Sequence, residues 1–420
     1  MIIALILFAI TYVLMLGFSK YRTYIALGSA VLFIVTGMLP LDKIIGSIDF
    51  NVLLMIAGSM GLVQLFIDSK MPDLLAEIII NKVKNVQMAA VALALFAGII
   101  SAFVDNVATV LMVAPVAIQI CKKLNTNPVP FIISIAVSSN LQGAATLVGD
   151  TTAIMLGGEA GMSFLDFFWY EGKPSIFFAV ELGAITSALI LAFIFRKEKQ
   201  PIPKQEAATK VTDYVPTVLL LAMLGLLISA SFIENKPDIT NGLICCVLLV
   251  IGLVYNYFKY RTKESVIEPI KAIDFQTLGL LLGLFLMIGG ITEQGVIAAA
   301  ADLLAKLGGG NEFLLFTIIV WASVLISAFI DNIPYVATML PIITGLGINP
   351  TLLYFGLLSG ATLGGNCTPI GASANITGTA ILRKEGFEVK NKDFFRIGIP
   401  FTLAAVISSY IYLWLVYGTH

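Results

Sequence analysis

The sequence predicts an all-α polytopic membrane protein of two inverted repeats, with about ten spanning helices and two re-entrant hairpins. Of its 420 residues, 58% are hydrophobic and 12% are charged, about half the charge of a soluble domain. Apolar runs of roughly 17 to 20 residues recur from end to end, and such runs cross bilayers as helices. The stretch SAFVDNVATVLMVAP at 101–115 returns as SAFIDNIPYVATMLP at 327–341, which indicates one unit used twice.

Ten apolar segments are predicted to span the membrane. They lie at 2–18, 24–40, 50–67, 129–156, 174–195, 215–233, 241–258, 275–292, 351–380 and 397–417. Two helical hairpins are predicted at 87–122 and 312–345. Shorter amphipathic segments at 72–84 and 296–307 are expected to lie along the membrane interface before each hairpin. The first segment lacks a basic start and a cleavage site, so it is expected to be a retained helix.

A polar stretch with two prolines, 196–214, divides the chain into a first repeat at 1–195 and a second at 215–420. Ile48-Asp49-Phe50 in the first repeat matches Ile273-Asp274-Phe275 in the second. Each repeat has five predicted spans, an odd number, so the second must insert upside down relative to the first. Inverted repeats of this kind are typical of secondary transporters with a binding site near the membrane midplane.

The basic residues support this arrangement, because 21 of the 25 Lys and Arg residues fall on one side of it. Cytoplasmic loops carry such an excess. The sequence therefore predicts a plasma-membrane protein with a cytoplasmic linker and both termini outside the cytoplasm. The first hairpin would enter from the cytoplasm and the second from outside.

Both hairpin tips carry an Asp-Asn pair, Asp105-Asn106 and Asp331-Asn332. A carboxylate inside an apolar segment is costly in lipid and favours an ion or substrate site that faces the protein interior. The alternative is a surface turn between two full spans. Legs of about 15 to 18 residues are shorter than a full span, which favours re-entrance.

Each hairpin is followed by an interrupted span. The segments are NLQGAATLVGDTTA at 140–153 and TLGGNCTPIGASAN at 362–375. They align so that Gly143 pairs with Gly365, Thr146 with Thr368 and Gly149 with Gly371. These glycines are expected to be hinge positions that free backbone carbonyls, with half-helix ends facing an ion. The alternative is a glycine-rich packing face between helices.

The expected site holds three carboxylates, Asp105, Asp150 and Asp331, and no Lys or Arg, which favours a cation or a proton. Asp150 has Ala372 as its counterpart, and it is either the group that takes up a proton or a helix N-cap. One better-formed site, for a sodium ion, is expected in the second repeat at Asn332, Asn366, Thr368 and Asn375. The full set of candidate ligands is Asp105, Asn106, Thr146, Asp150, Asp331, Asn332, Asn366, Thr368 and Asn375.

Other function classes lack their usual residues. The one histidine is His420, and the four cysteines do not have metal-ligand spacing. No nucleophile–base pair, nucleotide-binding motif or basic patch is visible, so an enzyme, a self-contained ATP-driven pump and a nucleic-acid binder are not expected. No cofactor is expected beyond a coupling sodium ion or proton. Glu181, within a predicted span, is expected to make a hydrogen bond between helices rather than to take part in transport.

Together the two hairpin tips and the motif GGNCTPIGASAN resemble the ion-transporter superfamily, over nearly the whole chain. The similarity is to permeases that include arsenite-efflux pumps, NhaD-type sodium/proton antiporters and the melanosomal P protein. Divalent-anion/sodium symporters are more distantly similar. One motif departs from the family pattern Gly-Asp-Pro-Pro-Asn, because 149–153 reads Gly-Asp-Thr-Thr-Ala.

The resemblance implies a scaffold domain, a transport domain of hairpins and broken helices that moves like an elevator, and a homodimer joined through the scaffolds. The expected function is secondary transport of a small ion, through sodium/proton or arsenite/proton antiport. The alternatives are sodium-coupled symport of a small anion such as a dicarboxylate, or a role as the membrane subunit of an ATP-driven arsenite pump. The expected partners are the lipid bilayer, a second copy of the chain and the small ion.

Overall fold

The computed structural model describes residues 1–124, 126–202, 209–211 and 213–418, so His420 and part of the predicted linker lie outside the described residues. The chain is mostly helical, at 77%. The one sheet among the described residues is a small hairpin of β1 (Trp169–Tyr170) and β2 (Lys173–Pro174).

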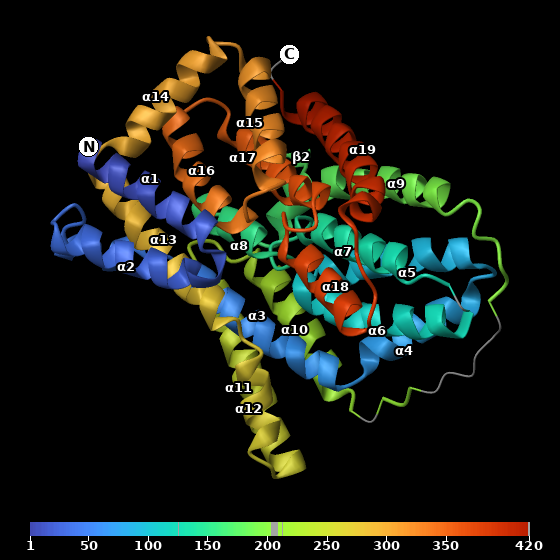
Figure 1. The fold of residues 1–420 in the computed structure, drawn as a ribbon. Coiled ribbons are helices and arrows are strands. Elements are labelled where there is room, and N and C mark those ends of the chain that lie inside the picture. The colour runs from blue at the N-terminus through green and yellow to red at the C-terminus, as the bar shows by residue number, and fades with distance from the viewer. Residues whose placement is uncertain (125, 203–208, 212, 419–420) are drawn as a thin grey trace.

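The helices follow the predicted order in both halves of the chain, which are the two predicted repeats (Figure 1). The first repeat contains α1 (Ile2–Gly17), α2 (Arg22–Val35), α3 (Phe50–Asp68), α4 (Met71–Lys82), α5 (Val86–Ser101), α6 (Asn106–Leu124), α7 (Val129–Gly143), α8 (Thr151–Glu159) and α9 (Ile176–Ile194). The second contains α10 (Val215–Ala230), α11 (Thr240–Tyr260), α12 (Glu264–Lys271), α13 (Phe275–Glu293), α14 (Val296–Gly308), α15 (Glu312–Ser327), α16 (Asn332–Leu346), α17 (Pro350–Leu358), α18 (Ser373–Lys384) and α19 (Asn391–Tyr417). The short helix α12 and the β-hairpin were not expected from the sequence.

In the described part of the chain, six helices are long and apolar enough to cross a membrane, or seven if α14 and α15, bent by 115°, form one span. Five of the six, α3, α9, α11, α13 and α19, coincide with predicted spans. The sixth is α6, a leg of the first predicted hairpin. Its 19 residues contradict the expectation of short legs there. Shorter or interrupted helices occupy the other predicted spans, so the total of ten crossings stays a prediction.

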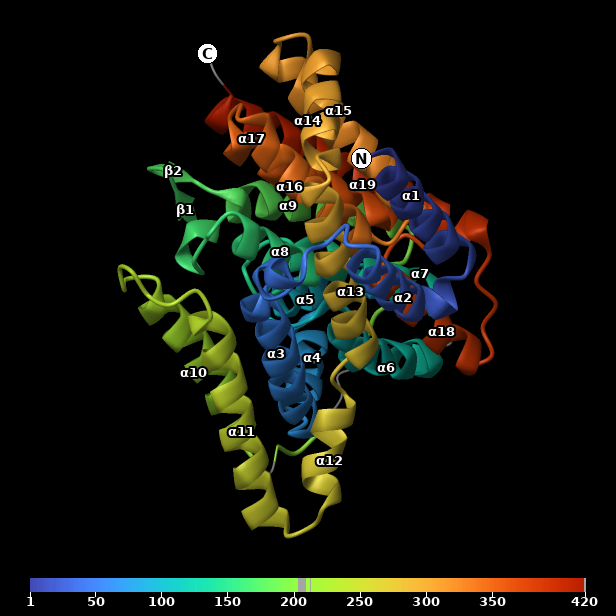
Figure 2. The same cartoon turned by 90° about the vertical axis from the view of Figure 1, so that its left-hand side faces the viewer.

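Close helix pairs recur in equivalent places of the two repeats. Helix α3 packs along α11, and α13 packs along α2 (Figures 1 and 2). Both contacts depend on glycine. A Cβ added to Gly58 would lie 2.5 Å from the carbonyl carbon of Cys245, and one added to Gly283 would lie 2.7 Å from that of Ala26. Small residues at such crossings let the two backbones approach closely.

The interrupted spans form the centre of the molecule. All residues of α7 except Pro130 and all residues of α17 except Pro350 are buried. Helix α7 contacts α5, α6, α18 and α19, and α17 contacts α15, α16 and α19. Helix α7 thus lies against both legs of the first predicted hairpin, and α17 lies against both legs of the second. This packing positions the hairpin tips.

The described part of the linker is attached to the helices around it. The amides of Val86 and Gln87 donate to carbonyls of Gln200 and Glu198, at 3.0 and 2.8 Å. At the other end, Asp213 accepts a charge-assisted bond of 2.8 Å from Lys259. Burial alone would raise the pKa of Asp213, but the hydrogen bonds from Lys259 and backbone outweigh it and lower that pKa. The ion pair between Asp213 and Lys259 is therefore present at neutral pH, and it is lost only as the pH falls through the lowered pKa of Asp213.

Replacing Gly58 by alanine tests the α3–α11 contact. The added methyl group would meet the α11 backbone, so we expect Gly58→Ala to lower the stability by about 1–3 kcal/mol. The control is Gly225→Ala, because no atom lies within 4 Å of a Cβ there and alanine favours a helix by up to about 1 kcal/mol. Thermal unfolding in detergent would measure the stability of both variants. Equal unfolding midpoints for Gly58→Ala and Gly225→Ala would contradict the close contact between α3 and α11.

Candidate functional site

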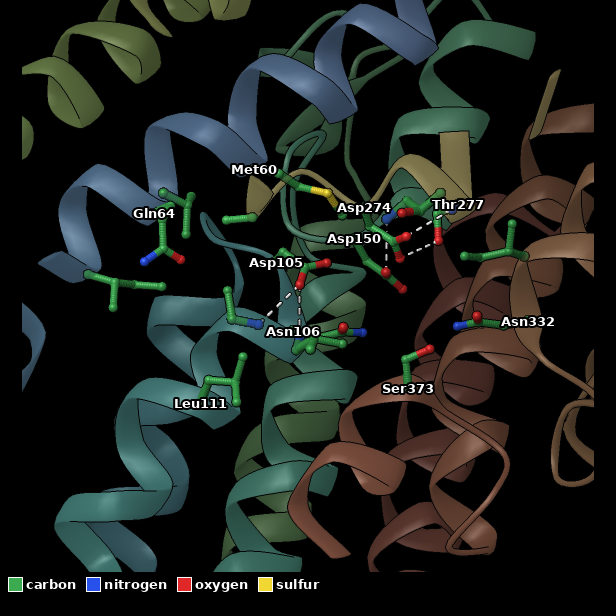
Figure 3. A pocket seen from close by; sticks show the side chains of 17 residues that line it. Met60, Gln64, Asp105, Asn106, Leu111, Asp150, Asp274, Thr277, Asn332 and Ser373 are labelled. Carbon is green, nitrogen blue, oxygen red and sulfur yellow. Dashed lines mark hydrogen bonds between the residues drawn. The ribbon is translucent and has the colours of Figure 1, made fainter. Parts of the chain in front are cut away.

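A cavity of about 230 Å³ lies where the N-terminal ends of five helices meet the side of α3 (Figure 3). Helices α6 and α16 follow the two hairpin tips, and helices α8 and α18 follow the two interruptions. The fifth helix is α13. The polar residues that line it are Gln64, Asp105, Asn106, Asp150, Thr151, Asp274, Thr277, Asn332 and Ser373. The lining contains residues from both repeats and, among the described residues, no Lys or Arg.

Three carboxylates in the lining cap helix N-termini. Asp105 Oδ1 accepts from the amides of Val107 and Ala108 at 3.0 and 3.1 Å. Asp150 accepts from the amide of Thr151 at 2.8 Å, and Asp274 from that of Thr277 at 3.0 Å. The positive end of each helix dipole partly offsets these charges. Asp150 is therefore a helix cap, whereas its expected role in proton uptake stays a prediction.

Asp274 is a lining residue that sequence reasoning missed. It lies near Asp105, close enough for the two like charges to interact. The signal available in the sequence was the repeated Ile-Asp-Phe triplet, but an aspartate before a helix is more often an ordinary N-cap than a site residue.

Asp331 does not occupy a position equivalent to that of Asp105. It caps α16 through the Ile333 amide at 3.2 Å, and its other oxygen pairs with the guanidinium of Arg22 at the start of α2. It is not among the lining residues. The expectation that no basic side chain accompanies the three carboxylates is therefore wrong for Asp331. A second contact lies nearby, because Tyr12 of α1 donates to the carbonyl of Pro334 at 2.6 Å.

The predicted threonines and glycines anchor the hairpin tips to the interrupted spans. Thr146 donates to the carbonyl of Ala102, and Thr368 donates to that of Ala328. The glycines allow this approach. A Cβ on Gly149 would lie 2.5 Å from the Gly143 oxygen, and one on Gly371 equally close to the Gly365 oxygen. These residues hold the backbone in both repeats, and their side chains do not line the cavity.

Buried amides connect the two interrupted spans behind the cavity. Asn106 donates to Asn140 at 3.1 Å, and Asn140 donates to Asn366 at 3.0 Å and to the Thr362 carbonyl at 2.7 Å. Asn366 in turn donates to the carbonyl of Val137 at 3.0 Å. Asn366 thus belongs to this network rather than to the lining. Asn140 was not singled out from the sequence, because its counterpart in the other repeat is Thr362 and the repeat therefore gave no signal.

The two repeats differ most at the ends of their interruptions. Asn375 donates to the carbonyls of Gly365 and Thr368, at 3.1 and 3.0 Å, while its Oδ1 is buried and has no hydrogen-bond partner in the part of the chain that the structure describes. Helix α18 starts after Ala372 and has no side-chain cap, unlike α8. Asn332 lines the cavity near this end, 5% exposed, and no described residue makes a hydrogen bond to its carboxamide. No cluster of three or more His, Cys, Asp and Glu side chains suited to a metal ion occurs in the described part of the chain.

The amide network predicts the effect of one substitution. Asn140→Leu would leave Asn106, Asn366 and the Thr362 carbonyl without their buried partner, at about 1 kcal/mol or more for each. We expect a loss of about 3 kcal/mol in stability, measured by thermal unfolding. Asn51→Leu, at the half-buried start of α3, is the control and should cost less. An unchanged midpoint in Asn140→Leu would show that the network contributes little.

Comparison with known proteins places the chain among transporters. The 46 kDa membrane protein of Mycobacterium leprae is 30% identical over 433 residues, which cover 99% of both chains. The P protein of Homo sapiens is 26% identical over 496 residues, which cover 98% of this chain and 59% of the P protein. The solved YdaH transporter of Alcanivorax borkumensis shares the fold, with a TM-score of 0.61 at 14% identity and coverage of 89% of this chain and 87% of that one.

The family profile described as citrate transporter matches residues 3–347 and, a second time, residues 242–419. These matches extend over almost the whole chain, including both hairpin tips and both interrupted spans. The chain belongs to the citrate transporter family.

Proposed function

We propose that the protein is a secondary active transporter that moves a small ion by alternating access and is coupled to protons or sodium. The observation that carries this proposal is the cavity at the hairpin tips. Half-helix ends from both repeats meet there around three carboxylates, an arrangement typical of binding sites in secondary transporters. Its volume suits a small ion with a few water molecules.

The charge of the lining favours a cation or a proton as the coupled species. Asp105, Asp150 and Asp274 line the cavity without a basic side chain from the described residues. Helix N-termini offset only part of this negative charge. A bound cation or proton would offset the rest, and Asp150, which has no acidic counterpart in the second repeat, is the proposed site of proton uptake.

Asn375 supplies a second place for a cation in this proposal. Its amide nitrogen now bonds to the carbonyls of Gly365 and Thr368. Turning the carboxamide over would bring its unpartnered Oδ1 beside the same two carbonyl oxygens. Hard cations prefer oxygen ligands of this kind. This refines the predicted sodium site, with Thr368 contributing its backbone carbonyl and Asn366 remaining in the amide network.

Symport of a small anion is the second candidate, and a different observation favours it. Helix α18 presents an N-terminus without a side-chain cap, and such an end attracts anions. The carboxamide of Asn332 and the hydroxyl of Ser373 lie beside it in the lining. A carboxylate of the substrate would then take the position that Asp150 occupies at α8, with the cation sites supplying the coupling.

We also propose that the two halves are inverted repeats that move as an elevator within a homodimer. The equivalent helix pairs, α3 with α11 and α13 with α2, support a repeated scaffold. The matched contacts of Thr146 and Thr368 support a repeated transport unit. The overlap of the two family matches, at 242–347, is in line with an internal repeat. In this arrangement both termini lie outside the cytoplasm.

The ion pair between Arg22 and Asp331 would then join the scaffold to the transport domain. Arg22 begins α2 on the proposed cytoplasmic side, whereas the hairpin of α15 and α16 would enter from outside. Its tip can reach Arg22 only when the transport domain lies toward the cytoplasm. The pair would therefore stabilise the inward-facing state and break on the outward movement.

Asp105→Asn tests the role of the cavity. Asparagine is also a good N-cap, so we expect normal expression together with loss of transport, because the cavity loses a charge and not a helix cap. Purified protein in liposomes with an interior pH dye would report fluxes on addition of sodium, lithium, arsenite or citrate. Asp302→Asn, an exposed position on α14, is the control and should transport normally. Normal transport by Asp105→Asn would remove this carboxylate from the site.

Arg22→Gln tests the contact between the two domains. A partly exposed ion pair contributes about 0.2–1 kcal/mol, so we expect hydrogen exchange at residues 328–334 to rise by up to about five-fold. Lys122→Gln breaks the exposed pair with Glu385 and should leave exchange at that tip unchanged. Equal exchange in both variants would show that Arg22 does not hold the hairpin.

A further inference from the structure

Glu181 is a carboxylate inside an apolar helix, away from the cavity. It is the only charged residue of α9 and is half-buried. One hydrogen bond from a described residue reaches it, from Nε2 of Gln142 at 3.5 Å, the long limit for such a bond. An ionised carboxylate in these surroundings would lose most of its hydration and gain little in return.

Gln142, the residue that makes this bond, also lacks a hydrogen-bond donor for its own carboxamide oxygen. It lies at the end of α7 and is 1% exposed. Its Oε1 is buried and accepts no hydrogen bond from the described residues. A buried acceptor without a donor destabilises the fold, because it has lost its hydrogen bonds to water. The oxygen of Gln142 therefore needs a hydrogen-bond donor. Glu181 lies beside it, but an ionised carboxylate has no proton to donate.

The carboxamide of Gln142 occupies a space that α5 leaves for it. Gly98 of α5 lies against it, and a Cβ at that position would be 2.7 Å from Gln142 Oε1. Helix α5 contacts both α7 and α9, which lie beside it in Figure 1. The three helices thus enclose the amide next to Glu181, and the glycine makes this possible.

We infer that Glu181 and Gln142 form a proton-binding site separate from the cavity, in which the protonated Glu181 carboxyl donates to Gln142 Oε1. The two atoms of the carboxamide belong to one planar group, so a half-turn about its Cγ–Cδ bond brings Oε1 to the position that Nε2 now occupies. One proton then supplies the missing donor. It converts the ionised carboxylate into a neutral acid and gives Oε1 a donor, while Nε2 gives up its bond to Glu181 and moves to the place against Gly98 that Oε1 now occupies.

No other charged group of the described chain offers an alternative partner. Helices α5 and α7 contain no charged residue. The titratable residues of α19 are Lys392, Asp393, Arg396, Tyr410, Tyr412 and Tyr417. Ser409 of α19 donates to the carbonyl of Ala179, so the charged start of that helix lies several turns from Glu181. Tyr410, close in register, has its hydroxyl bonded to Thr317.

This site connects to the cavity through the backbone. Gln142 precedes Gly143, where a Cβ would lie 3.0 Å from the Cβ of Asp150. The end of α7 that carries Gln142 therefore supports the residue that caps α8 in the cavity wall. A proton bound at Glu181 would hold this end of α7 in place without entering the cavity.

Infrared spectroscopy of the full-length protein in lipid tests the inference directly, because a protonated carboxyl and a carboxylate absorb in separate regions. We expect the difference between the wild type and Glu181→Gln at pH 7 to show the loss of one protonated carboxyl band. Glu234→Gln, at an exposed loop position, should instead lose carboxylate absorption. Loss of carboxylate absorption in Glu181→Gln would overturn the proposal.

A second pair of variants tests the partner and does not depend on how well Glu181→Gln folds. Gln142→Met removes the acceptor, and Gly98→Ala displaces the carboxamide. Both should shift the same carboxyl band toward the frequency of a carboxyl group without a hydrogen bond, while Asp150→Asn leaves it in place. A band that does not move in Gln142→Met would contradict the bond to Oε1.

Discussion

The two hairpin tips can remain non-helical inside an apolar protein because the interrupted spans satisfy their backbone carbonyls. Such groups find no water in a membrane interior and must bond within the protein. Thr146 and Thr368 supply the bonds, to Ala102 and Ala328, while glycines allow the chains to approach. Each tip and its interrupted span therefore form one unit, and the helix N-termini that follow them converge on the cavity.

The sequence predicted this unit well because the repeat gives two copies of each element. The paired glycines and the paired threonines make matching contacts in both halves, whereas of the two tip aspartates only Asp105 lines the cavity. The repeat could not indicate contacts that occur only once. Arg22 and Asp331 are 309 residues apart, and neither the spacing nor the hydrophobic pattern points from one to the other. Asp274 was hidden for another reason, since its local sequence is that of an ordinary helix cap.

The differences between the repeats carry most of the chemical interest. Asp150 caps α8, whereas Ala372 leaves α18 without a side-chain cap. Conversely, Asn375 bonds to carbonyls freed by the second interruption, and its counterpart in the first is alanine. The cavity is therefore asymmetric. Asp105 and Asp150 come from the first half of the chain, whereas Asp274 and the uncapped end of α18 come from the second.

In the proposed function, a cation or proton bound in this acid-lined cavity is coupled to movement of the substrate. The most direct measurement is the reversal point of net substrate flux in liposomes, with the membrane potential held constant and the sodium or pH gradient varied. Coupling predicts that the reversal point moves with one of the two gradients. A reversal point that depends on the substrate gradient alone, for each transported substrate, would contradict it.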